Sequence, residues 1–191
     1  MDTIICVAGK EHLVFAQEIC QQIEESAKIR GTGIAKRDPR YIADKISEGK
    51  AVIALCNNQL AGFCYIEHWE EKKYIANSGL IIVPRFRGLG LAKKVKEASF
   101  ALSKKLFPEA KLFGLTTSGA VMKINSDLGY KPVVFDELTK DESFWKGCQS
   151  CVNHDILVRN NRKYCLCTAM LYHDKKEESN LYKTNHQTIQ L

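Results

Sequence analysis

The sequence has no apolar run that approaches the ~20 residues needed to span a bilayer. Its first apolar run covers only residues 4–8, and the residues before it, Met1, Asp2 and Thr3, carry no basic charge of the kind that opens an export signal. Both absences argue against a secreted or membrane-embedded protein. We therefore expect a soluble, cytoplasmic protein with no membrane partner.

The chain also carries little excess charge. Its 28 Lys and Arg residues exceed its 22 Asp and Glu residues by six, which is too small a surplus to argue for a nucleic-acid partner. No stretch interleaves basic and aromatic residues as a strand-stacking surface would. A mild positive excess suits a small acidic ligand. With 191 residues, 45% of them hydrophobic, the chain can bury one substantial core.

Two common phosphate-binding signatures are missing, the G-x-G-x-x-G dinucleotide fingerprint and the Walker A loop. A different glycine-spaced turn is present. The apolar run 80–83 meets Pro84, a basic turn with Gly88 and Gly90 follows, and apolar residues then recur at helical spacing from Leu91. Glycines let a backbone approach a ligand, and the first N–H groups of the new helix point to the same place. The stretch predicts a strand, a phosphate-holding turn and a helix.

The rest of the chain predicts alternating strands and helices. Asp38 and Pro39 are typical of a helix start, and Pro108 forbids extension of the helix that follows the glycine turn. We expect strands at residues 4–8, 51–56, 59–68, 74–83, 111–116 and 130–136, and helices at 11–28, 39–48, 91–105 and 120–128.

Residues 87–92, Arg-Gly-Leu-Gly-Leu-Ala, fit the Q/R-x-x-G-x-G/A pyrophosphate motif, and the chain resembles the GCN5-related N-acetyltransferases. The resemblance implies an α/β (α+β) fold with a mixed central sheet of six to seven strands flanked by helices. Strands of that sheet part to admit the pantetheine arm of acetyl-CoA or another acyl-CoA. The resemblance assigns cofactor binding to Ile81, Ile82, Val83, Arg87, Gly88, Leu89, Gly90, Leu91, Ala92, Lys93, Ser118 and Asn125.

Residues 33–145 are similar to one branch in particular, the acyltransferase domain of N-acetylglutamate synthases. The matching pieces are residues 33–37, 111–118 and 129–138, and they imply a glutamate acceptor, as in arginine biosynthesis. In that branch, an arginine that binds the substrate carboxylate stands where this chain has Ser118. We therefore expect other cations to bind the substrate carboxylate. Arg37 is the first candidate, because it lies in the matching piece at residues 33–37; the other candidates are Lys36, Arg85 and Lys123.

Acyl transfer to an amine needs a neutral amine, a stabilised oxyanion and a protonated leaving thiolate. The resemblance implies a glutamate base and a tyrosine acid, but the usual tyrosine position falls on Asn125, which cannot donate a proton usefully. Glu67 and Tyr65 are our candidate base and acid, because strand alternation places both on one face if the strand is regular. Asn125 is expected to hydrogen-bond the thiol or the carbonyl.

Eight cysteines are present, and four of them form the pattern C-x2-C-x13-C-x-C at Cys148, Cys151, Cys165 and Cys167. Disulfides are disfavoured in the cytosol, so we expect a structural zinc site away from the acyl chemistry; a redox pair and plain thiols are the alternatives. A strand at residues 163–171 would place the second pair on one face. The remaining cysteines suit buried apolar positions.

We expect an acyltransferase domain at 1–140, a Cys-rich appendage at 141–173 packed on it, and a flexible polar tail at 174–191. The leading function is acyl transfer to a small-molecule amino acid, with a homodimer as the candidate assembly. Two alternatives remain open: acetylation of a protein, a peptide or a small amine, and acyl-CoA binding without catalysis.

Overall fold

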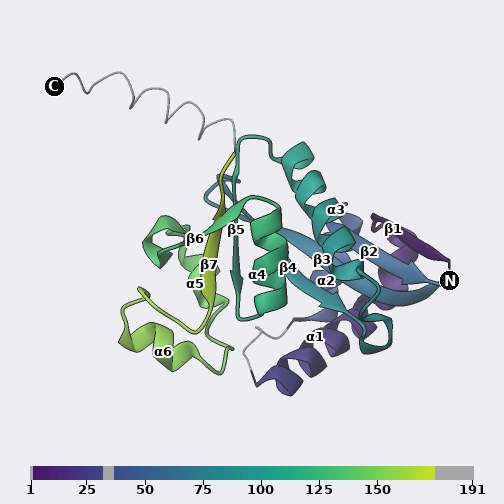
Figure 1. The fold of residues 1–191 in the computed structure, drawn as a ribbon, viewed down its shortest axis with the longest axis horizontal. Helices are drawn as coiled ribbons and strands as arrows, with labels where there is room; N and C mark the ends of the chain where they lie inside the picture. The colour runs from purple at the N-terminus through teal and green to yellow at the C-terminus, as the bar shows by residue number, and fades with distance from the viewer. Residues whose placement is uncertain (1, 32–36, 175–191) are drawn as a thin grey trace.

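A computed structural model describes residues 2–31 and 37–174 (Figure 1). The matched residues 33–36, among them Lys36, and the expected tail beyond residue 174 lie outside the described residues. The elements in chain order are β1 (Thr3–Val7), η1 (Lys10–Phe15), α1 (Ala16–Arg30), α2 (Pro39–Ser47), β2 (Ala51–Cys56), β3 (Gln59–Trp69), β4 (Tyr74–Ile82), η2 (Pro84–Phe86), α3 (Leu91–Leu106), β5 (Lys111–Thr116), α4 (Gly119–Asp127), β6 (Tyr130–Val133), η3 (Phe135–Glu137), α5 (Glu142–Lys146), α6 (His154–Arg159) and β7 (Thr168–Tyr172).

The strands form one seven-stranded sheet in the order β1-β2-β3-β4-β5-β7-β6. β4 and β5 pair in parallel, whereas the other neighbours pair antiparallel. The parallel pair follows from the long crossover through α3, since parallel neighbours cannot be joined by a short turn. The expected mixed sheet of six to seven strands flanked by helices is confirmed.

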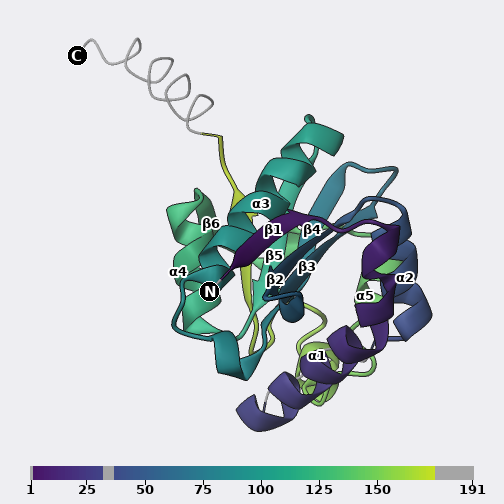
Figure 2. The same cartoon turned by 90° about the vertical axis from the view of Figure 1, so that its right-hand side faces the viewer.

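Helices cover both faces of the sheet, α3 and α4 on one face and α1, α2 and α5 on the other (Figure 2). Buried apolar residues between these layers form the main core, with Ile19, Ile42 and Phe63 fully enclosed. None of the described helices is long and apolar enough to cross a bilayer.

Local sequence explains most of the element boundaries. Asp38 caps α2 by accepting a hydrogen bond of 2.7 Å from the Arg40 N–H, and Pro39 occupies the first turn. Asn57 and Asn58 take positive φ angles of 48° and 60°, as a two-residue hairpin turn requires. The predicted helix 39–48, hairpin 51–68 and strand 111–116 therefore agree with the structure to within one residue.

Two predicted strands differ. β6 ends at Val133 and the chain continues into the 3-10 helix η3, whereas the sequence predicted a strand to residue 136. β7 begins only at Thr168, which pairs with Thr116, the last residue of β5, so a strand from 163 is wrong. β7 lies between β5 and β6, so the segment 141–173 supplies a strand of the sheet itself. The division of the chain at residue 140 stays a prediction.

Candidate active site

The strands β4 and β5 separate partway along their length. They pair from Tyr74 with Lys111 to Ala76 with Phe113, and beyond this point both strands line a cavity of about 700 Å³. Residues from α2, β3, α4 and the region of α5 complete its walls. The volume is in the range of small-molecule binding sites.

A β-bulge in β4 faces this cavity. The pairing of β3 with β4 shifts between Phe63 and Tyr65, so that Gly79 and Leu80 together oppose one residue of β3. Gly79 has a φ of +63°, and a Cβ added there would clash with the Tyr65 ring, so the position requires glycine. A bulge leaves one residue outside the hydrogen-bond ladder. Gly79 and Leu80 both line the cavity.

The turn between β4 and α3 has the left-handed backbone that its glycines predict. Gly88 has a φ of +82°, and Gly90, the N-cap of α3, has a φ of +72°. A Cβ added at either glycine would meet no heavy atom of the described residues within 4 Å. Glycine is thus needed at both positions because of the positive φ, and not because a side chain would lack space. Both glycines are exposed, which leaves the first N–H groups of α3 open to an anionic ligand.

Arg87, in this turn, makes hydrogen bonds to β4 and to α1. Its Nε donates a hydrogen bond of 3.2 Å to the Ile82 carbonyl, and its Nη2 donates one of 3.3 Å to Ser26 Oγ in α1. Ile81 and Val83, which the resemblance assigns to the cofactor, are buried, and Gly79 and Leu80 of the same strand line the cavity; contact of Ile81 and Val83 with a cofactor stays a prediction. Arg87 therefore joins the end of β4 to α1, and its contact with a cofactor stays a prediction.

Four side chains gather at the side of the cavity near α2. Arg37 Nε donates a hydrogen bond to the Tyr65 hydroxyl, and the Tyr41 hydroxyl donates one of 2.5 Å to Glu67 Oε1. The rings of Tyr41 and Tyr65 meet edge to face, with centroids 5.9 Å apart. Arg37, Tyr41 and Glu67 line the cavity, whereas Tyr65 lies fully buried behind them. Regular alternation along β3 therefore does bring Tyr65 and Glu67 to one cluster.

Burial and mutual charge set the protonation of this cluster. Burial alone would lower the pKa of Arg37, but Tyr65 and Glu67 outweigh it and raise that pKa, so the guanidinium remains charged. Burial, and then the Glu67 carboxylate, raise the pKa of Tyr41 and of Tyr65 above the usual value near 10. Both phenols therefore keep their protons at neutral pH. The wall presents a cation, a carboxylate and phenol hydroxyls.

Two buried amides lie beside the gap between β4 and β5. Asn125 Nδ2 contacts Met170 Sδ at 3.6 Å and lies 3.6 Å from a Cβ added at Gly114. Asn77 Nδ2 donates a hydrogen bond of 2.7 Å to Ser103 Oγ. The Oδ1 atoms of Asn77 and Asn125 have no hydrogen-bond partner among the described residues. Buried acceptors are rarely left unpaired, so these two oxygens are exceptions in the part of the chain that the structure describes. Asn77 also belongs to the cavity lining.

The other predicted substrate residues are more scattered. Arg37 lines the cavity, whereas Arg85 is exposed on the glycine turn and Lys123 is exposed on α4. Ser118, which replaces the family's arginine, caps α4 and also lines the cavity. The structure therefore brings Arg37 and Ser118 to one cavity and leaves Arg85 and Lys123 outside its lining.

Three of the four C-terminal cysteines, Cys148, Cys151 and Cys167, line the same cavity as Arg37. This placement contradicts the expectation that the cysteine segment lies apart from the candidate site. No group of three or more His, Cys, Asp or Glu side chains in residues 2–31 and 37–174 is placed to hold a metal ion. Because Cys165 and Cys167 precede β7 instead of lying within a strand, alternation does not bring them to one face. The structure thus gives the zinc prediction no support.

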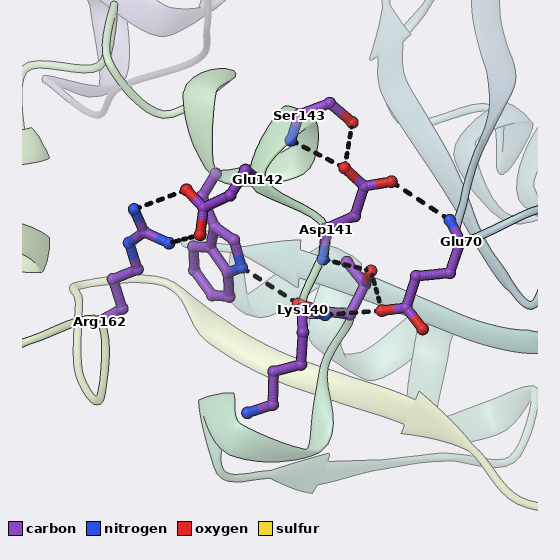
Figure 3. Close-up of polar contacts among 8 residues, drawn as sticks. Glu70, Lys140, Asp141, Glu142, Ser143 and Arg162 are labelled. Atoms are coloured by element: carbon purple, nitrogen blue, oxygen red, sulfur yellow. Dashed lines mark hydrogen bonds and ion pairs between the residues drawn. The ribbon is translucent and has the colours of Figure 1, made fainter.

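A polar network fixes the cysteine segment to the sheet (Figure 3). The Glu70 carboxylate accepts a hydrogen bond of 2.7 Å from the Thr139 hydroxyl, and the Glu70 N–H donates one of 3.3 Å to Asp141, the N-cap of α5. Arg162 donates two hydrogen bonds, of 2.6 Å and 2.9 Å, to the Glu142 carboxylate. The turn after β3 is therefore joined to the start of α5, and α5 is joined to the turn after α6. Ser143 and Phe144 of α5 line the cavity.

Sequence reasoning missed four residues of the site, Tyr41, Asn77, Gly79 and Leu80. Gly79 had a usable signal, since an isolated glycine inside an apolar strand often marks a bulge. Tyr41 and Asn77 had none, because only the packing of α2 and α3 on the sheet gives them their partners.

No family model and no curated protein matches this sequence. Solved structures do match its fold. N-acetylglutamate synthase from Neisseria gonorrhoeae, complexed with coenzyme A and N-acetyl-glutamate, superposes with a TM-score of 0.64 at 16% identity, covering 91% of this chain and 36% of that chain. This chain therefore spans little more than a third of the synthase.

Two shorter enzymes match over most of their own length. An acetyltransferase of the GNAT family from Staphylococcus aureus has a TM-score of 0.58 at 13% identity, covering 72% of this chain and 89% of that one. The ribosomal-protein-S18-alanine N-acetyltransferase from Escherichia coli has a TM-score of 0.55 at 13% identity, covering 90% and 93%. At such identities the likeness concerns the fold alone.

Proposed function

We propose that this chain, whose fold is that of the GCN5-related N-acetyltransferases, is an acyl-CoA-dependent N-acyltransferase. It moves an acetyl or other short acyl group to the amine of an amino acid, with glutamate as the first candidate. One observation carries the proposal. The strand β4 contains the bulge that lines the cavity, and the glycine turn that follows β4 leads to the exposed N-terminus of α3.

The donor half of the proposal rests on three features along that strand. The N–H groups before and within the first turn of α3 suit the pyrophosphate of coenzyme A. The unpaired Oδ1 atoms of Asn77 and Asn125 suit the amide N–H groups of a pantetheine arm lying in the gap between β4 and β5. The N–H groups at Gly79 and Leu80 suit the thioester carbonyl, where charge develops during transfer.

The acceptor half rests on the cluster at Arg37. A guanidinium binds a carboxylate through two parallel hydrogen bonds, and Arg37 lines the cavity as a charged group. Glu67 lines the same cavity and is the candidate base that takes a proton from the acceptor ammonium. A small amino acid with its carboxylate at Arg37 would thus present its amine beside Glu67.

The reaction then follows from these placements. The neutral amine nitrogen attacks the thioester carbonyl, a C–N bond forms, and the C–S bond breaks to release the thiolate of coenzyme A. Glu67 holds the proton that the ammonium gave up before the attack, and the proton that the nitrogen loses as the amide forms passes to the departing thiolate of coenzyme A. The bulge N–H groups stabilise the negative charge on the carbonyl oxygen. Tyr41 holds the Glu67 carboxylate through its 2.5 Å hydrogen bond and so acts as a positioning residue.

The likeness to the ribosomal-protein-S18-alanine N-acetyltransferase favours a second candidate, acetylation of a peptide or protein amine. A screen separates the two. Purified protein is incubated with acetyl-CoA and longer short-chain acyl-CoAs, each against the amino acids, N-terminal peptides and polyamines, and free thiol release is followed.

We expect thiol release that depends on glutamate or a close dicarboxylic relative. Release that depends on peptides or polyamines, with every amino acid inert, supports the second candidate. Binding of acyl-CoA without release for any amine would support a non-catalytic acyl-CoA-binding protein.

A further inference from the structure

Four thiols from two segments line one small cavity. Cys148 and Cys151 precede α6, Cys165 and Cys167 follow it, and all four border a space of about 30 Å³. Each is a free, partly buried thiol. Burial, and then the three other cysteines, raise the pKa of Cys167 to about 12.

One backbone turn joins Cys148 to Cys151. The Cys151 N–H donates a hydrogen bond of 3.0 Å to the Cys148 carbonyl, which closes a four-residue turn. Such turns bring their first and last Cα atoms within about 7 Å, and disulfides span Cα separations of about 4.4–6.8 Å. Bridging this pair therefore needs little movement of the backbone.

The polar network of Figure 3 keeps that turn in place. Arg162 and Glu142 link α5 to the loop after α6, and Trp145 Nε1 donates a hydrogen bond of 3.0 Å to the Thr139 carbonyl. The turn that carries Cys148 and Cys151 follows α5 directly. A bond between the two sulfur atoms would thus form in a segment that these hydrogen bonds already hold in place.

We propose that Cys148 and Cys151 form a reversible disulfide when the protein meets a peroxide. The Cys151 thiolate attacks one peroxide oxygen, the O–O bond breaks, and hydroxide leaves, giving a sulfenic acid. The Cys148 sulfur then attacks the Cys151 sulfur and displaces its hydroxyl group as water, after losing its own proton. Two thiols are oxidised and one hydrogen peroxide molecule is reduced to two water molecules.

The surroundings of the two sulfur atoms assign these roles. The Asn153 N–H donates a hydrogen bond of 3.4 Å to Cys151 Sγ and so orients that sulfur. Cys151, whose sulfur this N–H group orients, therefore forms the sulfenic acid, and Cys148, at the other end of the same turn, resolves it. Both residues also line the large cavity with Arg37, but the inference does not depend on the proposed function.

The test uses the reduced full-length protein treated with hydrogen peroxide in molar excess. We expect the intact mass to fall by about 2 mass units, with two of the eight thiols lost to a thiol reagent. Peptide mapping should join Cys148 to Cys151, and dithiothreitol should restore both thiols. Cys148→Ser should stop the reaction at a sulfenic acid on Cys151 that dimedone traps, and Cys151→Ser should abolish both products. The matched control Cys6→Ser, in β1, should still form the disulfide.

Three results would overturn the inference. The first is a zinc content of about one ion per chain in protein purified without added metal, with the four thiols unreactive until a chelator removes the zinc. Another is a peroxide-treated protein that keeps all of its thiols. The third is a disulfide that joins other cysteines and persists in Cys151→Ser. Each readout is independent of any acyl-transfer assay.

Discussion

The Tyr41 hydroxyl donates a hydrogen bond of 2.5 Å to Glu67 Oε1 and so connects α2 to β3 at the wall of the cavity. Burial and the Glu67 carboxylate raise the pKa of Tyr41, so the hydroxyl keeps its proton and remains a donor throughout the neutral range. The carboxylate proposed as the base is therefore held in one orientation by a group on a different element.

The first prediction concerns this hydrogen bond. Tyr41→Phe removes the donor and leaves the ring, so we expect kcat to fall roughly tenfold, the equivalent of one hydrogen bond to a charged group, while the KM for acyl-CoA stays unchanged. Steady-state kinetics measure both values. Tyr164→Phe, at an exposed position, is the control and should behave as the wild type. A Tyr41→Phe enzyme with wild-type kcat would remove Tyr41 from the mechanism.

The second prediction concerns the glycine turn. Gly90→Ala places a side chain at a φ of +72°, a conformation that costs an L-residue about 1–2 kcal/mol, and we expect the Kd for acyl-CoA to rise roughly tenfold because the N–H groups shift. Gly49→Ala is a matched control, since Gly49 has a φ of +65° and open space around it. Calorimetry should show a loss of affinity in the first variant only. An equal loss in both would mean that general destabilisation, and not the turn, weakens binding.

The third prediction concerns Arg37. Lysine keeps the charge but cannot form the two parallel hydrogen bonds of a guanidinium, so Arg37→Lys should raise the KM for glutamate by roughly tenfold or more. The KM for acyl-CoA should change little. Arg40→Lys, on the exposed surface of α2, should leave both constants as they are. If glutamate saturates Arg37→Lys as it does the wild type, Arg37 does not bind the acceptor.

The fourth prediction concerns Tyr130, whose hydroxyl is buried and has no hydrogen-bond partner among the described residues. Removing such a group relieves a desolvation penalty, so Tyr130→Phe should leave the free energy of unfolding unchanged or raise it by about 1 kcal/mol. Lys96 Nζ, 5.3 Å from the ring centroid, keeps its aromatic contact in the variant. Denaturant unfolding at pH 7 tests this, and a clear loss of stability would show that the hydroxyl has a partner.

The stability of the same variant at alkaline pH provides a second test. Burial raises the pKa of Tyr130 above its value in the unfolded chain, so above about pH 10 the unfolded state loses a proton that the folded state keeps. The unfolded state then binds fewer protons, and stability falls as the pH rises. Tyr130→Phe should therefore lose less stability than the wild type between about pH 9 and pH 11. Parallel pH curves for the two proteins would contradict this.

Much of the fold follows from local signals in the sequence. Asp38 and Pro39 predict the start of α2, Asn57 and Asn58 predict the hairpin, and Gly88 and Gly90 predict the turn before α3. Each signal acts through the backbone of its own neighbourhood, by capping a helix end or by permitting a positive φ. Such features do not depend on the rest of the chain.

The features that sequence reasoning missed depend on distant partners. β7 pairs with both β5 and β6, and nothing within Thr168–Tyr172 indicates that it enters the sheet between them. The contacts of Tyr41 with Glu67 and of Arg37 with Tyr65 likewise require α2 and the residues before it to pack on β3. The same pairing of β7 explains why the cysteines border the cavity, since the chain must return to the sheet after α6.

Identification of the product shows whether the chain acylates glutamate. The purified protein is incubated with acetyl-CoA carrying a ¹³C label in the acetyl group, together with glutamate and a mixture of N-terminal peptides, and the products are analysed by mass spectrometry. We expect the label on the α-nitrogen of glutamate, and we expect Gly90→Ala and Arg37→Lys each to slow its appearance. Label on the peptides alone, or acetyl-CoA left intact while every acceptor remains unmodified, would contradict it.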